Sequence, residues 1–326
     1  MTSMLRKFSA ALLLGTCGLL LVPAAQAQPY PSRPIRLIVP WAPGSPGDLV
    51  GRVVGQRMSA ALGQPITVDN RPGASGTVGM AEVLKQPADG YTLYMLGSPT
   101  LMAPLLYPSQ QVDIPKALQP VGHVAWGFNV LVTAAASPLA SPRDIVAAAA
   151  TRRDGLTFAS AGSGTPAHLA GELFRQRTGT TLSHVPYHQF PMAVTDVISG
   201  RVDFMFLTAS AAIPQVTGGK LKALAVTSTQ RLSALPQTPT MVEQGFPDFS
   251  VRGFEMLAVR SDTPRAIVER LNAELNEALR APQVKERFDS LSLVIDPMSP
   301  DQAHSVLVSE QRAWMQVARS LSLKAE

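Results

Sequence analysis

The sequence predicts an α/β protein of two lobes, each a mostly parallel sheet flanked by helices. Strand patterns alternate with helix patterns nearly throughout the chain, which is typical of parallel sheets joined by crossover helices. A buried strand followed by a Pro/Gly loop and a helix start occurs at residues 35–48, and the same arrangement recurs at residues 156–168. We therefore expect two lobes with matching strand–loop–helix junctions.

The first 27 residues have the pattern of a secretory signal peptide. Arg6 and Lys7 precede an apolar run at residues 12–22, and small residues at 25–27 predict cleavage after Ala27. The apolar run is too short to span a membrane. The 299 residues that remain of the 326 suit two domains, and we expect an exported protein.

Composition and charge exclude several classes of protein. The single cysteine, Cys17, lies in the signal, so disulfides and thiol chemistry are not expected in the mature chain. The net charge of +5 falls to +3 without Arg6 and Lys7, and no basic run is interleaved with aromatic residues, so no nucleic-acid partner is expected. His184 and His188 flank Pro186 and have no third ligand nearby, so no metal is expected.

The elements before the first crossing begin with the strand at 36–39. The helix that follows has Ser45 at its N-cap, Pro46 at its first position and Gly63 after its end. In order, we expect strand 36–39, helix 46–62, strand 66–69, a short helix ending near 86, strand 91–96 and a connecting strand at 121–132.

After a helix start at residues 141–144, the second lobe repeats the alternation. We expect strand 156–160, a helix from 166, strand 182–187, helix 191–199, strand 202–208, a short helix, strand 221–228, a return strand at 255–260 and an amphipathic helix at 264–279. The chain then crosses between lobes near 126 and near 254. We assign residues 28–125 and 254–326 to the first lobe and 126–253 to the second.

The two junctions predict where a ligand binds. A helix start with free backbone N–H groups at a strand end favours an anion, and ligands of open α/β sheets bind outside the carboxyl ends of strands. Two such junctions suggest that both lobes grip one small anionic ligand. The candidate residues from these positions are Trp41, Ser98, Thr100, Ser160, Ser163, Gly164, Thr165, His168, Tyr187 and Thr208.

Two catalytic interpretations fit less well. Residues 162–167 match the dinucleotide pattern G-x-G-x-x-A, but the next strand ends at residues 184–187 without the acidic residue that such a site needs. Ala161 replaces the first glycine of a G-x-S-x-G nucleophile elbow around Ser163, and no base is aligned with that serine. We therefore expect neither a cofactor nor catalysis, with a hydrolase as the less favoured alternative.

Several runs together resemble one family. They are residues 30–40, 70–74, 89–93, 164–174, 184–187, 223–228, Leu235-Pro236 and Pro239-Thr240. In these runs the chain resembles the periplasmic solute receptors of tripartite tricarboxylate transporters, often called Bug receptors, from about residue 29 to 320.

The resemblance implies a two-lobed periplasmic binding protein fold of type II-like form. It also implies capture of a small carboxylate by cleft closure, and delivery to a membrane permease of one large and one small subunit. A monomer in the periplasm is expected. A sensor that presents its closed form to a signalling partner would need the same hinge.

The resemblance also adds site residues. The family's Pro-Gly-Gly loop, which holds a ligand carboxylate, corresponds here to Pro43, Gly44 and Ser45. Two departures flank the expected cleft: Gln189 stands where the family usually has glycine, and Phe254 where it usually has tryptophan. We add both to the candidate ligand-binding residues and expect a side pocket of altered size or polarity.

Overall fold

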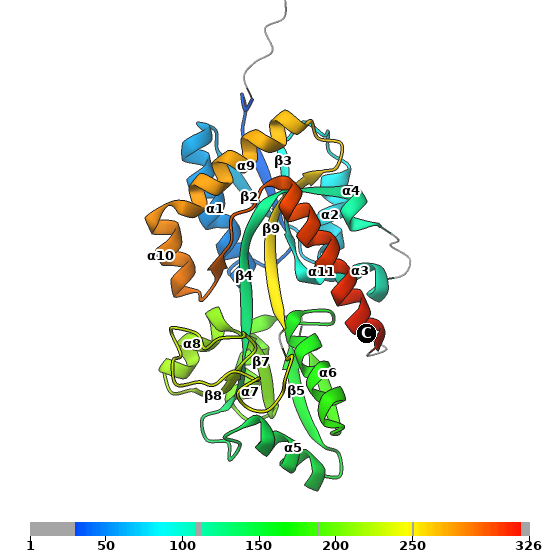
Figure 1. The fold of residues 1–326 in the computed structure, drawn as a ribbon, viewed down its shortest axis with the longest axis vertical. Helices are drawn as coiled ribbons and strands as arrows, with labels where there is room; N and C mark the ends of the chain where they lie inside the picture. Colours follow the sequence, from blue (N-terminus) through cyan, green and yellow to red (C-terminus); the bar gives the residue numbers. More distant parts are fainter. Residues whose placement is uncertain (1–29, 108–111, 188, 250, 321–326) are drawn as a thin grey trace, which may run out of the picture.

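The computed structural model describes residues 30–107, 112–187, 189–249 and 251–320 (Figure 1). Two lobes are stacked along the long axis, and the long strands β4 (Leu118–Ala134) and β9 (Arg252–Arg260) run between them. The α/β prediction is confirmed. The signal peptide at 1–27 and His188 lie outside the described residues. In the described ranges, no helix is both long and apolar enough to cross a membrane.

The first lobe is built on strands in the order β2-β1-β3-β9-β4. Strand β1 (Ile35–Val39) pairs in parallel with β2 (Ile66–Asn70) and β3 (Thr92–Gly97). Strand β9 is antiparallel to both β3 and β4, and β10 (Val294–Ile295) is antiparallel to β4. The sheet is thus parallel in its outer half and antiparallel at the crossing strands, because the chain leaves the lobe along β4 and returns along β9.

Helices cover both faces of this sheet. Helix α1 (Pro46–Leu62) begins after Ser45, whose side chain accepts the Asp48 N–H, and ends at Gly63 in the left-handed conformation. It packs with α9 (Arg265–Arg280) and α10 (Pro282–Ser290) over one apolar cluster. The opposite face carries α2 (Thr77–Leu84), α3 (Ser98–Leu106) and α11 (Pro300–Ser320). The short elements η1 (Ala74–Gly76) and α4 (Ile114–Ala117) complete the lobe.

The second lobe follows the order β8-β4-β7-β5-β6. Strand β5 (Leu156–Ser160) is parallel to β6 (Leu182–Pro186) and β7 (Phe204–Thr208), whereas β4 is antiparallel to β7 and β8 (Leu221–Val226). The helices of this lobe are α5 (Pro142–Thr151), α6 (Pro166–Thr178), α7 (Phe190–Ile198) and α8 (Ala209–Thr217). Packed aromatic rings form its core, among them Phe174, Phe206 and Phe249.

The change of sheet on β4 is sharp. Residues 118–128 pair with β9, and Asn129 is the first residue to pair with β7. Because β4 and β9 connect the lobes side by side, the residues at 127–129 and 252–255 lie where the two lobes meet.

Candidate functional site

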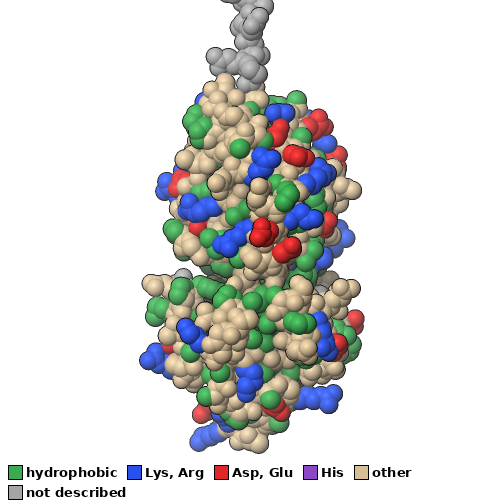
Figure 2. Space-filling view, turned by 90° about the vertical axis from the view of Figure 1, so that its left-hand side faces the viewer, with side chains coloured by type: hydrophobic (Ala, Val, Ile, Leu, Met, Phe, Trp, Pro, Cys, Tyr) green, Lys and Arg blue, Asp and Glu red, His purple; other side chains and the backbone are tan. Residues whose placement is uncertain are grey.

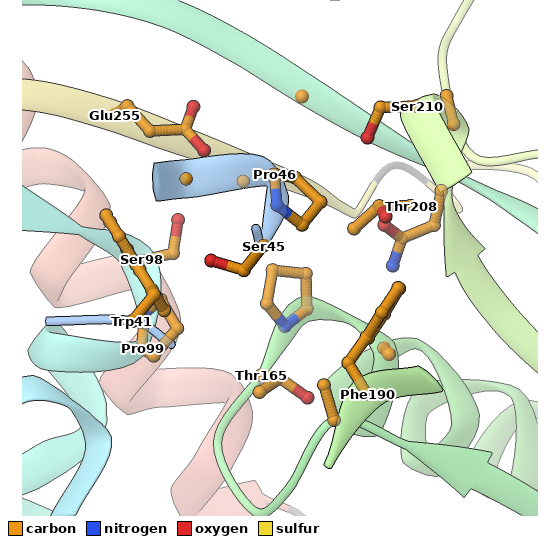
Figure 3. A pocket seen from close by; sticks show the side chains of 18 of the residues that line it. Trp41, Ser45, Pro46, Ser98, Pro99, Thr165, Phe190, Thr208, Ser210 and Glu255 are labelled. Atoms are coloured by element: carbon orange, nitrogen blue, oxygen red, sulfur yellow. The ribbon is translucent and has the colours of Figure 1, made fainter. Parts of the chain in front are cut away.

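A cavity of about 500 Å³ lies between the lobes, beside the crossing strands (Figure 3). Figure 2 shows the constriction between the lobes from the side. The residues that line it are Trp41, Ala42, Pro43, Gly44, Ser45, Pro46, Gly47, Ser98, Pro99, Gly127, Phe128, Asn129, Ala161, Thr165, Pro166, Ala167, Gln189, Phe190, Pro191, Met205, Thr208, Ala209, Ser210, Gly253, Phe254, Glu255, Leu291, Ser292 and Leu293.

Five helices begin at this cavity. Their first residues are part of its lining: Pro46 of α1, Ser98 of α3, Pro166 of α6, Phe190 of α7 and Ala209 of α8. A helix N-terminus carries a partial positive charge and unpaired N–H groups. Among the described residues that line the cavity there is no Lys, Arg or His. Among the described lining residues, helix N-termini are therefore the groups that carry positive partial charge, and such ends suit a small anion.

The α1 junction forms one wall of the cavity. The Trp41 ring packs on Gly47 and Gly97, where an added Cβ would lie 2.5 Å from the ring at either position. Gly44 has φ +79° and donates its N–H to Asp48 at 2.9 Å. Burial alone would raise the pKa of Asp48, but hydrogen bonds from Arg52, Asn70 and Gly44 hold it below its usual range. The loop is thus fixed by its own carboxylate.

Two predicted hydroxyl residues hold helix starts in place. Ser98 Oγ accepts the Phe254 N–H at 2.9 Å, which ties the start of α3 to β9. Thr165 caps α6: its hydroxyl accepts the His168 N–H and donates to Gly162 O at 2.8 Å. Both side chains line the cavity, together with Gln189 and Phe190 at the start of α7.

Nine of the fifteen predicted ligand-binding residues line the cavity, and they come from both lobes. They are Trp41, Pro43, Gly44, Ser45, Ser98, Thr165, Gln189, Thr208 and Phe254. Their contacts with a ligand remain a prediction.

The other six lie behind or beside the cavity. Thr100 is buried against the Tyr94 hydroxyl at 3.2 Å. Ser160 Oγ bonds His184 Nε2 at 2.7 Å, and the His184 ring stacks on His168 with centroids 4.0 Å apart. Tyr187 donates to Asp196 at 2.7 Å; burial, and then this carboxylate, raise the pKa of Tyr187 to about 12.

The loop of Ser163 and Gly164 faces the first lobe instead of the cavity. A Cβ on Gly164 would lie 2.5 Å from Leu106 of α3, and Ser163 O accepts a long hydrogen bond of 3.5 Å from Ser75. The second junction therefore contributes Thr165 and the start of α6 to the cavity, while its glycine loop forms a contact between the lobes.

Four polar groups at the cavity are buried and lack a hydrogen-bond partner among the described residues. They are Asn129 Nδ2, Thr208 Oγ1, Glu255 Oε2 and Ser292 Oγ. Asn129, 2% exposed, and Thr208 face each other in register across β4 and β7. Unpartnered buried polar groups are costly and rare in native folds, so their gathering at one cavity points to a ligand that bonds them.

Asn129, Glu255 and Ser292 were not among the ligand-binding residues predicted from the sequence. Asn129 stands between Phe128 and the apolar run at 130–132, and Glu255 interrupts an apolar return strand. A polar residue in a buried strand was therefore the available signal. Ser292 adopts φ +51° in the connection between α10 and β10, which no local pattern predicts.

The floor between these groups is made of glycine. Gly127 and Gly253 pair in register across β4 and β9, and Ala125 pairs with Glu255 two residues along. A methyl group at Gly127 would lie 3.3 Å from Leu293, and one at Gly253 the same distance from Pro166. The absence of side chains at these two positions therefore lets Leu293 and Pro166 pack close to the crossing strands.

Comparison with known proteins shows the family of this chain. Residues 50–322 match the family model described as "Tripartite tricarboxylate transporter family receptor". The chain belongs to this receptor family. It is 35% identical over 320 residues to the protein BugT of Bordetella pertussis, which covers 96% of this chain and 98% of that protein.

The fold is similar to solved structures of periplasmic binding proteins. The receptor resembles the periplasmic binding protein BugD with a TM-score of 0.83 and 28% identity, covering 91% of this chain and all of that one. It resembles Rpa4515 of R. palustris, solved with adipate, with a TM-score of 0.84 and 28% identity, covering 90% of this chain and 98% of that one. The predicted periplasmic binding protein fold is thereby confirmed.

Proposed function

We propose that this receptor captures a small carboxylate in the cavity between its lobes and delivers it to a two-subunit membrane permease. The observation that carries the proposal is the convergence of five helix N-termini on a cavity whose described lining has no basic side chain. Such helix ends hold a carboxylate through N–H groups and the helix dipole, at no cost of burying a cation.

Donors from both lobes would share the ligand. Ser45 and the start of α1 belong to the first lobe, and Thr208 and the starts of α6 and α8 to the second. Asn129 Nδ2 is a buried donor that a ligand oxygen would satisfy. A ligand that contacts both lobes stabilises the closed form relative to the open one, with β4 and β9 as the hinge between the first lobe, residues 28–125 and 254–326, and the second, residues 126–253.

The proposal includes a receptor role without catalysis. His168 and His184 of the second lobe stack on each other and are not among the described residues that line the cavity. Rpa4515, which resembles this receptor in fold and sequence, was solved with the dicarboxylate adipate, and BugD is a periplasmic binding protein. We therefore infer a periplasmic, monomeric solute receptor.

A thermal-shift screen of the chain from Gln28 onward tests the proposal. The panel contains monocarboxylates, dicarboxylates including adipate, and amino acids, with matched alcohols and amines that lack a carboxylate. A ligand at a concentration far above its dissociation constant stabilises the folded protein by about 3 kcal/mol. We expect at least one carboxylate to raise the melting temperature and the carboxylate-free compounds to have no effect. A folded, ligand-free protein that responds to no carboxylate would contradict the proposal.

A further inference from the structure

We propose that Glu255 is a specificity-determining residue of this receptor and that it binds a cationic nitrogen of the ligand, which is therefore an aminocarboxylate. The inference rests on the proposed carboxylate capture and names the ligand class within it. Glu255 is the one acidic residue among the described residues that line the cavity.

The position of Glu255 on β9 aims it at the ligand space. Residues 253, 255, 257 and 259 alternate to one face of the strand, and Leu257 and Val259 lie in the core under α1 and α9. Glu255 continues that face beyond the core, where the apolar packing ends and the cavity begins. Figure 3 shows its carboxyl group pointing into the space between Ser98, Ser45 and the second lobe.

One oxygen of the Glu255 carboxyl group has no partner in the part of the chain that the structure describes. Glu255 Oε2 is buried without a hydrogen bond from any described residue, and burial raises the pKa of Glu255 to about 7. A buried carboxylate is stable only when it is paired, protonated or hydrogen-bonded. The cavity thus holds a group that a donor, and above all a cationic donor, would satisfy.

Charged neighbours on the packed elements do not supply that donor. Arg252 lies on the opposite face of β9, 3.7 Å above the Trp126 ring, and pairs with Glu310 at 2.7 Å. His123 of β4 also faces that side: it stacks on Trp126 and contacts Asp296 O at 3.1 Å. On α1, Asp48 is held by Arg52 at 2.9 Å. None of these groups pairs with Glu255.

Ser292 offers a further polar oxygen in the cavity. Its Oγ is buried, lines the same cavity and has no partner among the described residues. The backbone fixes its place, because Ser292 donates its N–H to Asp289 O at 2.9 Å and Leu293 donates to Phe288 O at 3.0 Å. A hydroxyl oxygen in the same cavity as a carboxylate offers a second acceptor to an ammonium group, which has three donors.

The opposite end of the cavity has the reverse chemistry. Asn129 Nδ2 is a donor and lies four residues along β4 from Ala125, the register partner of Glu255, with the glycine pair between. At the rise of a strand this is about 13 Å of backbone. One end therefore suits a carboxylate and the other a cation. A dicarboxylate would bring its second negative charge to Glu255, which disfavours it.

Binding of two matched probe series tests the inference. One series holds ω-aminocarboxylates from glycine to 6-aminohexanoate together with the α-amino acids, and the other holds dicarboxylates from malonate to adipate. Isothermal titration at pH 8, where Glu255 is ionised, is made with the wild-type chain, with Glu255→Gln and with Glu269→Gln. Glu269 is an exposed residue of α9 paired with Arg265 and serves as the control.

We expect the tightest probe to be an aminocarboxylate, Glu255→Gln to weaken it at least tenfold, and Glu269→Gln to leave it unchanged. At pH 7 its binding should release protons, because the ammonium group favours the ionised form of Glu255. Tightest binding by a dicarboxylate, equal aminocarboxylate affinity in Glu255→Gln, or proton uptake would each overturn the inference. Dicarboxylate binding alone would leave the carboxylate receptor standing, whereas binding by neither series would contradict both proposals.

Discussion

At the scale of single residues, the candidate site is marked by buried polar atoms that have no partner among the described residues. Asn129, Thr208, Glu255 and Ser292 each have one such side-chain atom, which no described residue satisfies. Removal of such a group should therefore change ligand binding more than it lowers stability, the reverse of what holds for a residue of the core.

Thr208→Val tests this expectation. Valine has the shape of threonine without the hydroxyl, so the free energy of unfolding of the free protein should stay the same or rise slightly. A ligand that bonds Thr208 Oγ1 should bind about tenfold more weakly, near 1–2 kcal/mol. Calorimetric titration measures the affinity, with Thr151→Val at the end of α5 as the control. Equal affinity in the two variants would remove Thr208 from the site.

Glu255→Gln makes a separate prediction about stability and pH. Burial raises the pKa of Glu255 from its ordinary value of 4.5 to about 7 in the folded protein. Between these two values the folded state holds a proton that the unfolded state has released, so the wild-type protein loses stability as pH rises from 4.5 to 7. Glutamine removes this cost, and the free energy of unfolding at pH 8 should increase by about 2–3 kcal/mol.

Urea unfolding of both proteins at pH 4.5 and pH 8 measures the difference. The gain from Glu255→Gln should be present at pH 8 and small at pH 4.5, where the wild-type carboxyl is protonated in the folded state and half protonated in the unfolded state. A gain of equal size at both values would assign the effect to packing, and no gain at pH 8 would contradict the burial of an ionisable group there.

At the scale of elements, the junction at 35–48 was predictable because its signals are local. Ser45, Pro46 and Gly63 mark the ends of α1 by their own chemistry, and the structure has these caps. The wall of the cavity in the first lobe depends on a contact between distant parts of the sequence, in which the Trp41 ring lies against glycines of α1 and β3. That fit joins residues far apart in sequence, and no periodic pattern contains it.

Gly97→Ala tests the fit. Gly97 has φ −131°, which alanine adopts freely, so its cost arises from a methyl group 2.5 Å from Trp41. Overpacking of this kind costs about 1–3 kcal/mol, and the displaced ring should also change the ligand affinity. Thermal unfolding of Gly97→Ala, Trp41→Ala and the double variant forms a cycle, in which the alanine at 97 should cost little once Trp41 is absent. Purely additive losses would contradict the contact.

At the scale of the whole molecule, alternation of strands and helices predicts two α/β lobes, whereas the pairing of the crossing strands is set by tertiary structure. Gly127 meets Gly253, and Ala125 meets Glu255, only because β4 and β9 align over their full length. Likewise, the connection at 291–293 reaches the cavity from the end of α10. Most lining residues at the strand–helix junctions could be predicted, whereas on the hinge strands only Phe254 was predicted, and Asn129 and Glu255 were not.

In the proposed capture, β4 and β9 would act as the hinge between the lobes. Each lobe has its own apolar core, and the two described connections between the sheets are β4 and β9. A ligand held by helix starts of both lobes gains contacts only when these cores approach, so its binding free energy favours closure.

The most direct test of carboxylate capture between the lobes is a crystal structure with the carboxylate that stabilises the protein most in the thermal screen. We predict that the ligand lies between the starts of α1 and α3 and those of α6 and α8, with its carboxylate hydrogen-bonded to neutral donors from both lobes. A stabilising carboxylate bound outside this cavity, or held by one lobe alone, would contradict it.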